Sequence, residues 1–169
     1  LMSIDGFGSV IFDDRTVDID SATITVEGVT ATQSDLRQGQ SVLAITDATG
    51  TTASGIHYRS NLKGPATSVN IIDATLARTE LVIFGQTVRT NASTTFSEVD
   101  VFGLVVGDLY EVSGTVTATG VIEATYIERK PSLSEYKVTG SLTNLTATTF
   151  DLAGLSVDYA SATLQDFTK

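Results

Sequence analysis

The only histidine of the chain, His57, has the partners of a nucleophilic catalytic site near it in the sequence: Ser54, Ser60 and Asp47. In such a site the histidine accepts the serine proton and the carboxylate orients the imidazole, so geometry defines the site rather than closeness in sequence. When the chain is compared with itself, Glu128 stands at the position of His57. A charged residue at the equivalent position favours an exposed histidine near a strand end over a catalytic one.

The densest acidic cluster contains Asp13, Asp14, Asp18 and Asp20, and the last two share one face of an expected strand. Calcium requires six to eight oxygen ligands that converge from a loop. The cluster has no Asp-x-Asp-x-Asp-Gly pattern, and a matching segment replaces Asp18 with Arg89. We therefore expect a solvated acidic face, and no metal or other cofactor.

Two carboxylate pairs, Glu98 with Asp100 and Glu111 with Glu123, have the residue types of a glycoside hydrolase. That chemistry also needs a cleft with aromatic platforms, and the chain has no Trp. The sequence thus predicts a protein that is not an enzyme. Sugar binding without catalysis stays open, because some of the five tyrosines can be exposed: Tyr58, Tyr110, Tyr126, Tyr136 and Tyr159.

Charge and composition exclude further functions. The net charge is −10 and the pI is about 4.3, which opposes binding to a phosphate backbone, so we expect no nucleic-acid partner. The chain has no cysteine, so disulfides, thiolate nucleophiles and zinc–thiolate sites are excluded. The longest apolar runs, such as residues 81–84, are far shorter than the ~20 residues of a membrane-spanning helix, so no membrane insertion is expected.

The elements that would position these residues are strands. Val, Ile and Thr fill 55 of 169 positions, and β-branched side chains suit a pleated, half-buried surface. Residues 121–128 alternate, with Ile122, Ala124 and Tyr126 on one face. About five strands and one helical turn in each 65–70 residues predict an all-β chain of small OB-like barrels. An immunoglobulin-like sandwich, with about seven strands in 100 residues, is the alternative.

Internal repeats set the expected organisation. Residues 17–24 match residues 157–164 at five of eight positions, and residues 88–96 form a middle copy. Residues 36–42 likewise correspond to 104–110. The spacing predicts three units: a nearly complete barrel (1–60), a complete barrel (61–131) and the first half of a third (132–169).

Five segments resemble a known family: residues 6–11, 21–28, 35–40, 81–88 and 106–114. They are similar to the opening strands and turns of a bacterial domain-of-unknown-function family, number 5666. The resemblance extends over nearly the whole chain and departs at both ends. It implies a tandem array of small β-barrels in exported or cell-surface proteins. Because the family has no established activity, no site residue is carried over.

The third segment is expected to be an open half-barrel, completed in cis or in trans by another polypeptide segment. An open half-barrel exposes a strand edge, and unpaired edges recruit strands. Contact with a neighbouring copy would be head to tail and would generate a filament unless it closed into a ring. The apolar residues expected at this assembly interface are Val138, Leu142, Phe150, Leu152, Val157 and Leu164.

The sequence therefore favours a structural or adhesive protein that assembles with copies of itself. The alternative is a monomeric module that binds a glycan or another surface partner, and it requires an exposed platform of two or more tyrosines. Absence of cysteine together with 27 threonines and 16 serines is typical of secreted bacterial β-repeat proteins, so we expect an extracellular or cell-surface location.

Overall fold

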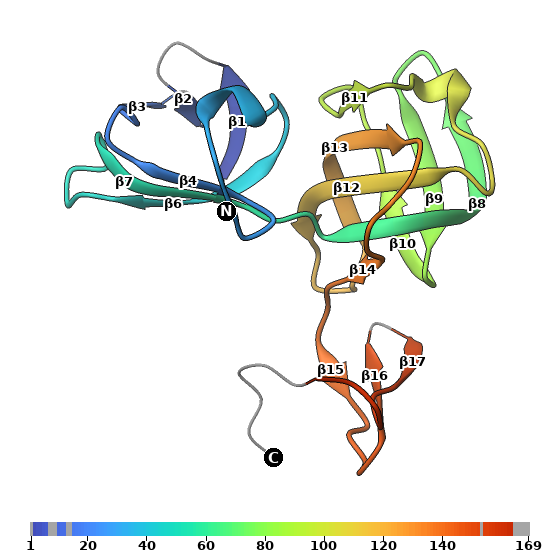
Figure 1. Ribbon diagram of the computed structural model, residues 1–169. Helices are drawn as coiled ribbons and strands as arrows, with labels where there is room; N and C mark the ends of the chain where they lie inside the picture. Colours follow the sequence, from blue (N-terminus) through green and yellow to red (C-terminus); the bar gives the residue numbers. More distant parts are fainter. Residues whose placement is uncertain (1, 7–9, 13–14, 153, 164–169) are drawn as a thin grey trace.

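The computed structural model describes residues 2–6, 10–12, 15–152 and 154–163 (Figure 1). In these residues the chain forms 17 strands and two short 3₁₀ helices, so the predicted all-β fold is confirmed. No helix in the described residues is long and apolar enough to cross a membrane.

The first sheet runs in the order β3-β2-β1-β6-β7-β4-β5. Its strands are β1 (Met2–Gly6), β2 (Val10–Phe12), β3 (Arg15–Val17), β4 (Thr23–Val26), β5 (Val29–Ala31), β6 (Ser41–Thr46) and β7 (Ala53–Tyr58). A parallel bridge between Asp18 and Thr52 joins the end of β3 to the start of β7, which curls the sheet back on itself. The core inside this first barrel includes Ile4, Leu36 and Ile56, all fully or nearly fully buried.

The second sheet is a closed barrel of five strands in the order β10-β9-β8-β12-β13, and parallel pairing of Val88 with Ile122 closes it. Its strands are β8 (Leu62–Asp73), β9 (Arg78–Ile83), β10 (Gln86–Arg89), β12 (Leu109–Val116) and β13 (Ile122–Lys130). Two short strands add to it: β11 (Thr95–Ser97) pairs with β13, and β14 (Lys137–Val138) pairs with β8. The predicted small closed barrel is thus confirmed for this part of the chain.

A β-bulge changes the predicted alternation along β13. Ile122 and Ala124 are in the core as expected, but the register against β12 shifts between Ser113 and Gly114. The extra residue brings Ile127 into the core and turns Tyr126 to the outside of the barrel, so the prediction for Tyr126 is wrong. The bulge also explains Gly114, because a Cβ there would lie 2.2 Å from a carbonyl oxygen of β13.

Each barrel has one 3₁₀ turn, which precedes β6 in the first barrel and β12 in the second. The turns are η1 (Gln33–Asp35) and η2 (Val101–Gly103). Thr32 and Asp35 cap the first by a reciprocal pair of side-chain contacts, and Asp100 caps the second by accepting hydrogen bonds from two backbone N–H groups. The one helical turn expected in each 65–70 residues is thus found in both barrels as a 3₁₀ turn of three residues.

The third sheet has three antiparallel strands, β15 (Leu142–Thr143), β16 (Thr149–Leu152) and β17 (Leu155–Asp158). Figure 1 shows the first two barrels side by side and this sheet set apart from both. Residues 137–138, which the sequence assigned to the third unit, pair instead with β8 of the second barrel. The division into units 1–60, 61–131 and 132–169 stays a prediction.

Candidate functional site

The two barrels meet directly, although only residues 59–61 link them. The backbone N–H of Ser41 donates to Ser113 Oγ at 2.9 Å in a fully buried contact, and Ser41 Oγ lies 3.2 Å from Thr125 Oγ1. Gly39 has φ +86°, and a Cβ there would lie 2.6 Å from the carbonyl oxygen of Thr125. A side chain at Gly39 would therefore push the barrels apart.

A lysine from the second barrel lies at the centre of this junction. Lys63, on β8, is buried, and its Nζ lies 3.4 Å from Glu27 Oε1, 3.3 Å from Glu135 Oε1 and 3.9 Å from Glu111 Oε2. Burial lowers the pKa of Lys63, but the negative charges of Glu111 and Glu27 outweigh it and raise that pKa overall. The ammonium group therefore stays charged and joins three segments of the chain.

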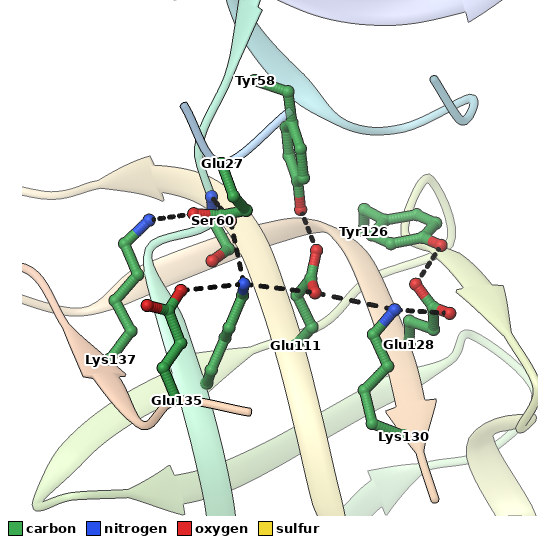
Figure 2. A network of polar contacts seen from close by, with 10 residues as sticks. Glu27, Tyr58, Ser60, Glu111, Tyr126, Glu128, Lys130, Glu135 and Lys137 are labelled. Carbon is green, nitrogen blue, oxygen red and sulfur yellow. Dashed lines mark hydrogen bonds and ion pairs between the residues drawn. The ribbon is translucent and has the colours of Figure 1, made fainter. Parts of the chain in front are cut away.

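Glu27 brings the first barrel into this network. Its carboxylate accepts a hydrogen bond from Lys137 Nζ at 2.8 Å and another from the backbone N–H of Ser60 at 2.8 Å (Figure 2). Burial raises the pKa of Glu27, but these hydrogen bonds outweigh it and lower the pKa to about 2. Glu27 is thus ionised throughout the physiological pH range.

The local backbone presents Glu27 at a hairpin turn. Glu27 and Gly28 have φ of +52° and +82° and connect β4 to β5, the geometry of a two-residue hairpin loop that favours Asn-Gly. A glutamate in this conformation costs of order 1 kcal/mol or more. The contacts of its carboxylate with two lysines and a backbone amide offset that cost.

Two tyrosines extend the network on its other side. Tyr58 donates to Glu111 Oε1 at 2.7 Å, and Tyr126 donates to Glu128 Oε2 at 2.9 Å. Figure 2 shows Lys130 between the two carboxylates, 2.8 Å from Glu128 and 3.6 Å from Glu111. Because Glu111 and Glu128 are direct cross-strand partners, Lys130 offsets a repulsion between like charges.

The tyrosine hydroxyls act as hydrogen-bond donors and keep their protons. Burial is the largest cause that raises the pKa of Tyr58 well above its usual value, followed by the negative charge of Glu111. Burial likewise raises the pKa of Tyr126. Neither group, nor Lys63 or Glu27, exchanges protons near neutral pH, which general acid–base catalysis requires. The arrangement is suited to clamping two barrels together.

The residues of the considered triad are not brought together as a relay. His57 Nδ1 lies 2.8 Å from Thr25 Oγ1, and Ser54 donates to the carbonyl oxygen of Ile45. Asp47 accepts hydrogen bonds from Thr49 and from backbone N–H groups of its own turn. His57, Ser54 and Asp47 thus each have another structural partner, and Ser60 lies at the junction, where its backbone N–H donates to Glu27.

The acidic residues also have local roles. Asp18 accepts a hydrogen bond from the backbone of Asp20 in a tight turn, and Asp100 caps η2. Asp13 and Asp14 lie outside the described residues. Among the described residues, no group of three or more His, Cys, Asp or Glu side chains is placed to hold a metal ion.

Four of the five tyrosines are buried: Tyr58, Tyr110, Tyr126 and Tyr159. Only Tyr136, with 66 % of its surface exposed, faces solvent, and its ring packs edge-on against Phe84. The described residues therefore contain no platform of two exposed tyrosines.

The predicted assembly residues divide into two groups. Val138 packs against the core of the second barrel, because β14 pairs with β8. Leu142, Phe150, Leu152 and Val157 lie on the third sheet, where Leu142 is exposed and the other three are half-buried. Leu164 lies outside the described residues.

Sequence reasoning missed the junction network entirely. Its members come from five separate segments, and each charged residue looks like an ordinary surface residue in the sequence. One signal was present: Glu27-Gly28 stands where a hairpin prefers Asn-Gly, which indicates that the side chain at position 27 has another role.

Residues 63–128 match the family described as "Domain of unknown function (DUF5666)". This segment begins in β8 and ends in β13, so it includes the five strands of the closed barrel. No curated protein and no solved structure matches the chain. The resemblance found in the sequence is thereby confirmed over residues 63–128, the segment that forms the second barrel.

Proposed function

We propose that the chain is a non-enzymatic structural or adhesive protein of the bacterial exterior, whose copies assemble through strand pairing between subunits. The observation that carries the proposal is the third sheet, residues 142–158. Within the described residues, β15 and β17 each pair only with β16, so the outer strands have unpaired backbone groups along one edge. Such edges are templates for pairing with another chain.

The two faces of this sheet differ in chemistry. Cross-strand partners point to the same face, and the pairing puts five apolar side chains on one side: Leu142, Phe150, Leu152, Leu155 and Val157. The other side carries Thr, Ser and Asp residues. A sheet with one apolar face buries that face against a second layer in a stable fold.

Comparison of the third sheet with the second barrel indicates which strands could pair with its open edges. Residues 149–158 align with β9 and β10, and in the second barrel the edges of the β8–β9–β10 meander are occupied by β12 and β13. Within the described residues, the third sheet thus has the form of this meander with both of its outer edges open. The tandem-repeat organisation is part of this proposal, and a neighbouring copy is the proposed source of the strands.

The clamped junction supports a load-bearing role, since two barrels fixed by buried polar contacts transmit force without a flexible linker. The glycan-binding alternative lacks support, because four of five tyrosines are buried. A location outside the cell remains part of the proposal, and it rests on the cysteine-free, threonine-rich composition.

The test compares two lysine substitutions on the same strand. Val157→Lys places a charge on the apolar face of β17, whereas Ser156→Lys places the same charge on the polar face opposite Asp151. Negative-stain microscopy and sedimentation velocity of the purified chain should show filaments for the wild type and S156K, and isolated particles for V157K. Filaments formed equally by V157K would contradict strand pairing at this face, and a wild type that stays monomeric at every concentration would contradict self-assembly.

A further inference from the structure

The third sheet ends in a turn that has the same structure as a turn of the first barrel. Residues 157–162 and 17–22 share Val, Asp, Ser and Ala at the same positions. Both segments also share two hydrogen bonds from backbone N–H groups: Asp20 to Asp18 Oδ1 and Ala160 to Asp158 Oδ1, both at 2.9 Å, and Ala22 to the Ile19 carbonyl and Ala162 to the Tyr159 carbonyl, at 2.9 and 3.0 Å. The third sheet therefore already has the local conformation that the first barrel uses at this point.

In the first barrel this turn closes the sheet against β7. The backbone N–H and C=O of Asp18 both form hydrogen bonds with β7, so that Asp18 pairs in parallel with Thr52. The equivalent residue of the second barrel, Arg89, pairs in parallel with Glu123 of β13. The same position of the repeat thus meets the same kind of strand, in the same direction, in both barrels.

The equivalent residue of the third sheet, Asp158, directs its backbone groups toward an open edge. The N–H of Tyr159 donates to the carbonyl oxygen of Thr148 at 2.8 Å. Antiparallel partners alternate between hydrogen-bonded and non-hydrogen-bonded pairs, so Asp158 and its partner Thr149 form a non-hydrogen-bonded pair. The N–H and C=O of Asp158 consequently point away from β16, toward the side on which β17 has no second partner strand within the described residues.

Burial of the preceding valine shows what the closing strand supplies. Val17 is 2 % exposed and Val88 is fully buried, each in the core of a barrel closed by a parallel strand. Val157 stands at the same position of the repeat, but it is only half-buried. The third sheet therefore has the apolar side chain for this contact without the cover that β7 and β13 give to its equivalents.

The two closing strands share a sequence pattern. Residues 52–56 are Thr-Ala-Ser-Gly-Ile, and residues 123–127 are Glu-Ala-Thr-Tyr-Ile. The first residue of each is polar and lies opposite Asp18 or Arg89. The alanine and the isoleucine are buried in both barrels: Ala53, Ile56, Ala124 and Ile127. A strand that fits beside Asp158 therefore has a polar residue, then a small apolar residue, then an isoleucine three positions later.

We propose that β17 accepts a strand of this pattern, in parallel, from another polypeptide that carries the same repeat. The polar first residue of the incoming strand lies opposite Asp158. The strand that precedes it occupies the β15 edge in the antiparallel direction, as β12 occupies the edge of β8. Main-chain hydrogen bonds provide the affinity, and the buried alanine and isoleucine provide the selectivity. The proposal rests on the proposed function in taking the third sheet as the assembly site, and it adds the direction, register and sequence of the incoming strand.

A synthetic hairpin of residues 109–130 tests the proposal on the full-length chain. The labelled peptide should bind in fluorescence anisotropy, and hydrogen exchange at Asp158 should slow. Ala124→Glu in the peptide places a charge at a buried position, whereas Thr125→Glu places it on the outer face. The A124E peptide should bind at least about ten-fold more weakly than T125E, because burying an unpaired charge is costly. Equal binding of the two peptides contradicts the proposed fit.

Disulfide trapping tests the direction of pairing, because the chain has no cysteine of its own. With Asp158 opposite Glu123, parallel pairing places Ser156 opposite Val121, and antiparallel pairing places Ser156 opposite Thr125. A Ser156→Cys chain should therefore form a disulfide with a Val121→Cys peptide and not with a Thr125→Cys peptide. The reverse preference, or equal trapping of both peptides, overturns the proposal.

The outcomes separate this proposal from self-assembly. A chain that binds the peptide but never self-associates removes self-assembly and keeps strand acceptance at β17. Filaments formed by a chain that does not bind the peptide remove strand acceptance of this kind and keep self-assembly. A Val157→Lys chain that binds the peptide as tightly as the wild type would place the binding elsewhere and likewise overturn the proposal.

Discussion

The junction between the two barrels and the connection to the third sheet share one network of ion pairs but differ in their other contacts. At the junction, three lysines and four glutamates form ion pairs, and buried hydroxyl groups of both barrels meet. The segment that leads to the third sheet contributes Glu135 and Lys137 to these ion pairs, and it is also held by β14, one hydrogen bond from Gln86 and the contact of Tyr136 with Phe84. The comparison teaches that the first two barrels form one clamped unit, whereas the third sheet keeps unpaired outer strands and one apolar face within the described residues.

The largest loss of folding stability should come from replacing Lys63. Lys63→Met leaves Glu27, Glu111 and Glu135 without their shared cation, and breaking a buried ion pair from one side costs about 3 kcal/mol. Urea unfolding curves should show this loss. Lys137→Met removes a more exposed lysine, so it should cost about 1 kcal/mol. Equal effects of the two variants would show that Lys63 is not the centre of the clamp.

Alanine substitutions at Gly39 and Gly107 separate the cost of backbone strain from the cost of a clash between the barrels. Gly39→Ala and Gly107→Ala both place alanine at positive φ, which costs about 1 kcal/mol. Only the Cβ at position 39 meets the other barrel, so G39A should cost about 1–3 kcal/mol more. Thermal melts of the monomeric chain at low salt measure both. A cost for G107A as large as that for G39A would mean that the junction does not depend on close approach at Gly39.

Acid should weaken the junction through Glu27. Its folded-state pKa of about 2 lies below the ordinary glutamate pKa of 4.5, so the unfolded chain binds the proton more readily. The contribution of Glu27 to stability is therefore complete above about pH 5 and is lost as the pH falls from about 4.5 toward 2. Melting temperatures of the wild type and Glu27→Gln should converge over that range. A difference that stays constant down to pH 2.5 would assign the acid sensitivity to other carboxylates.

The smallest effect concerns the connection to the third sheet. Tyr136→Ala removes an edge-on ring contact with Phe84 whose centroids are 6.1 Å apart, worth about 0.5–1.5 kcal/mol. Hydrogen exchange at β14 should accelerate, while exchange in β9 and β12 stays unchanged. Faster exchange throughout the second barrel would show that Tyr136 supports the barrel itself and not only the connection.

The sequence predicted the fold class better than the site, because alternation along a strand is local whereas the site forms from distant segments. Alternation along β13 correctly placed Ile122 and Ala124 in the core, because both precede the bulge. It failed at Tyr126, because a bulge depends on the pairing with β12, which a single strand does not encode. No period or motif connects Glu27, Lys63 and Glu111, which meet only after the two barrels are packed.

By itself, then, the sequence determined the strand-rich composition, the positions of the turns and the relationship of residues 63–128 to their family. These properties are local, since side-chain shape and glycine placement act within a few residues. Tertiary structure alone decided which charges are buried together, which face of β13 Tyr126 occupies, and that Gly39 abuts the other barrel whereas Gly107 is open. Those outcomes depend on contacts between segments far apart in the chain, where packing and desolvation, not local preference, set the energy.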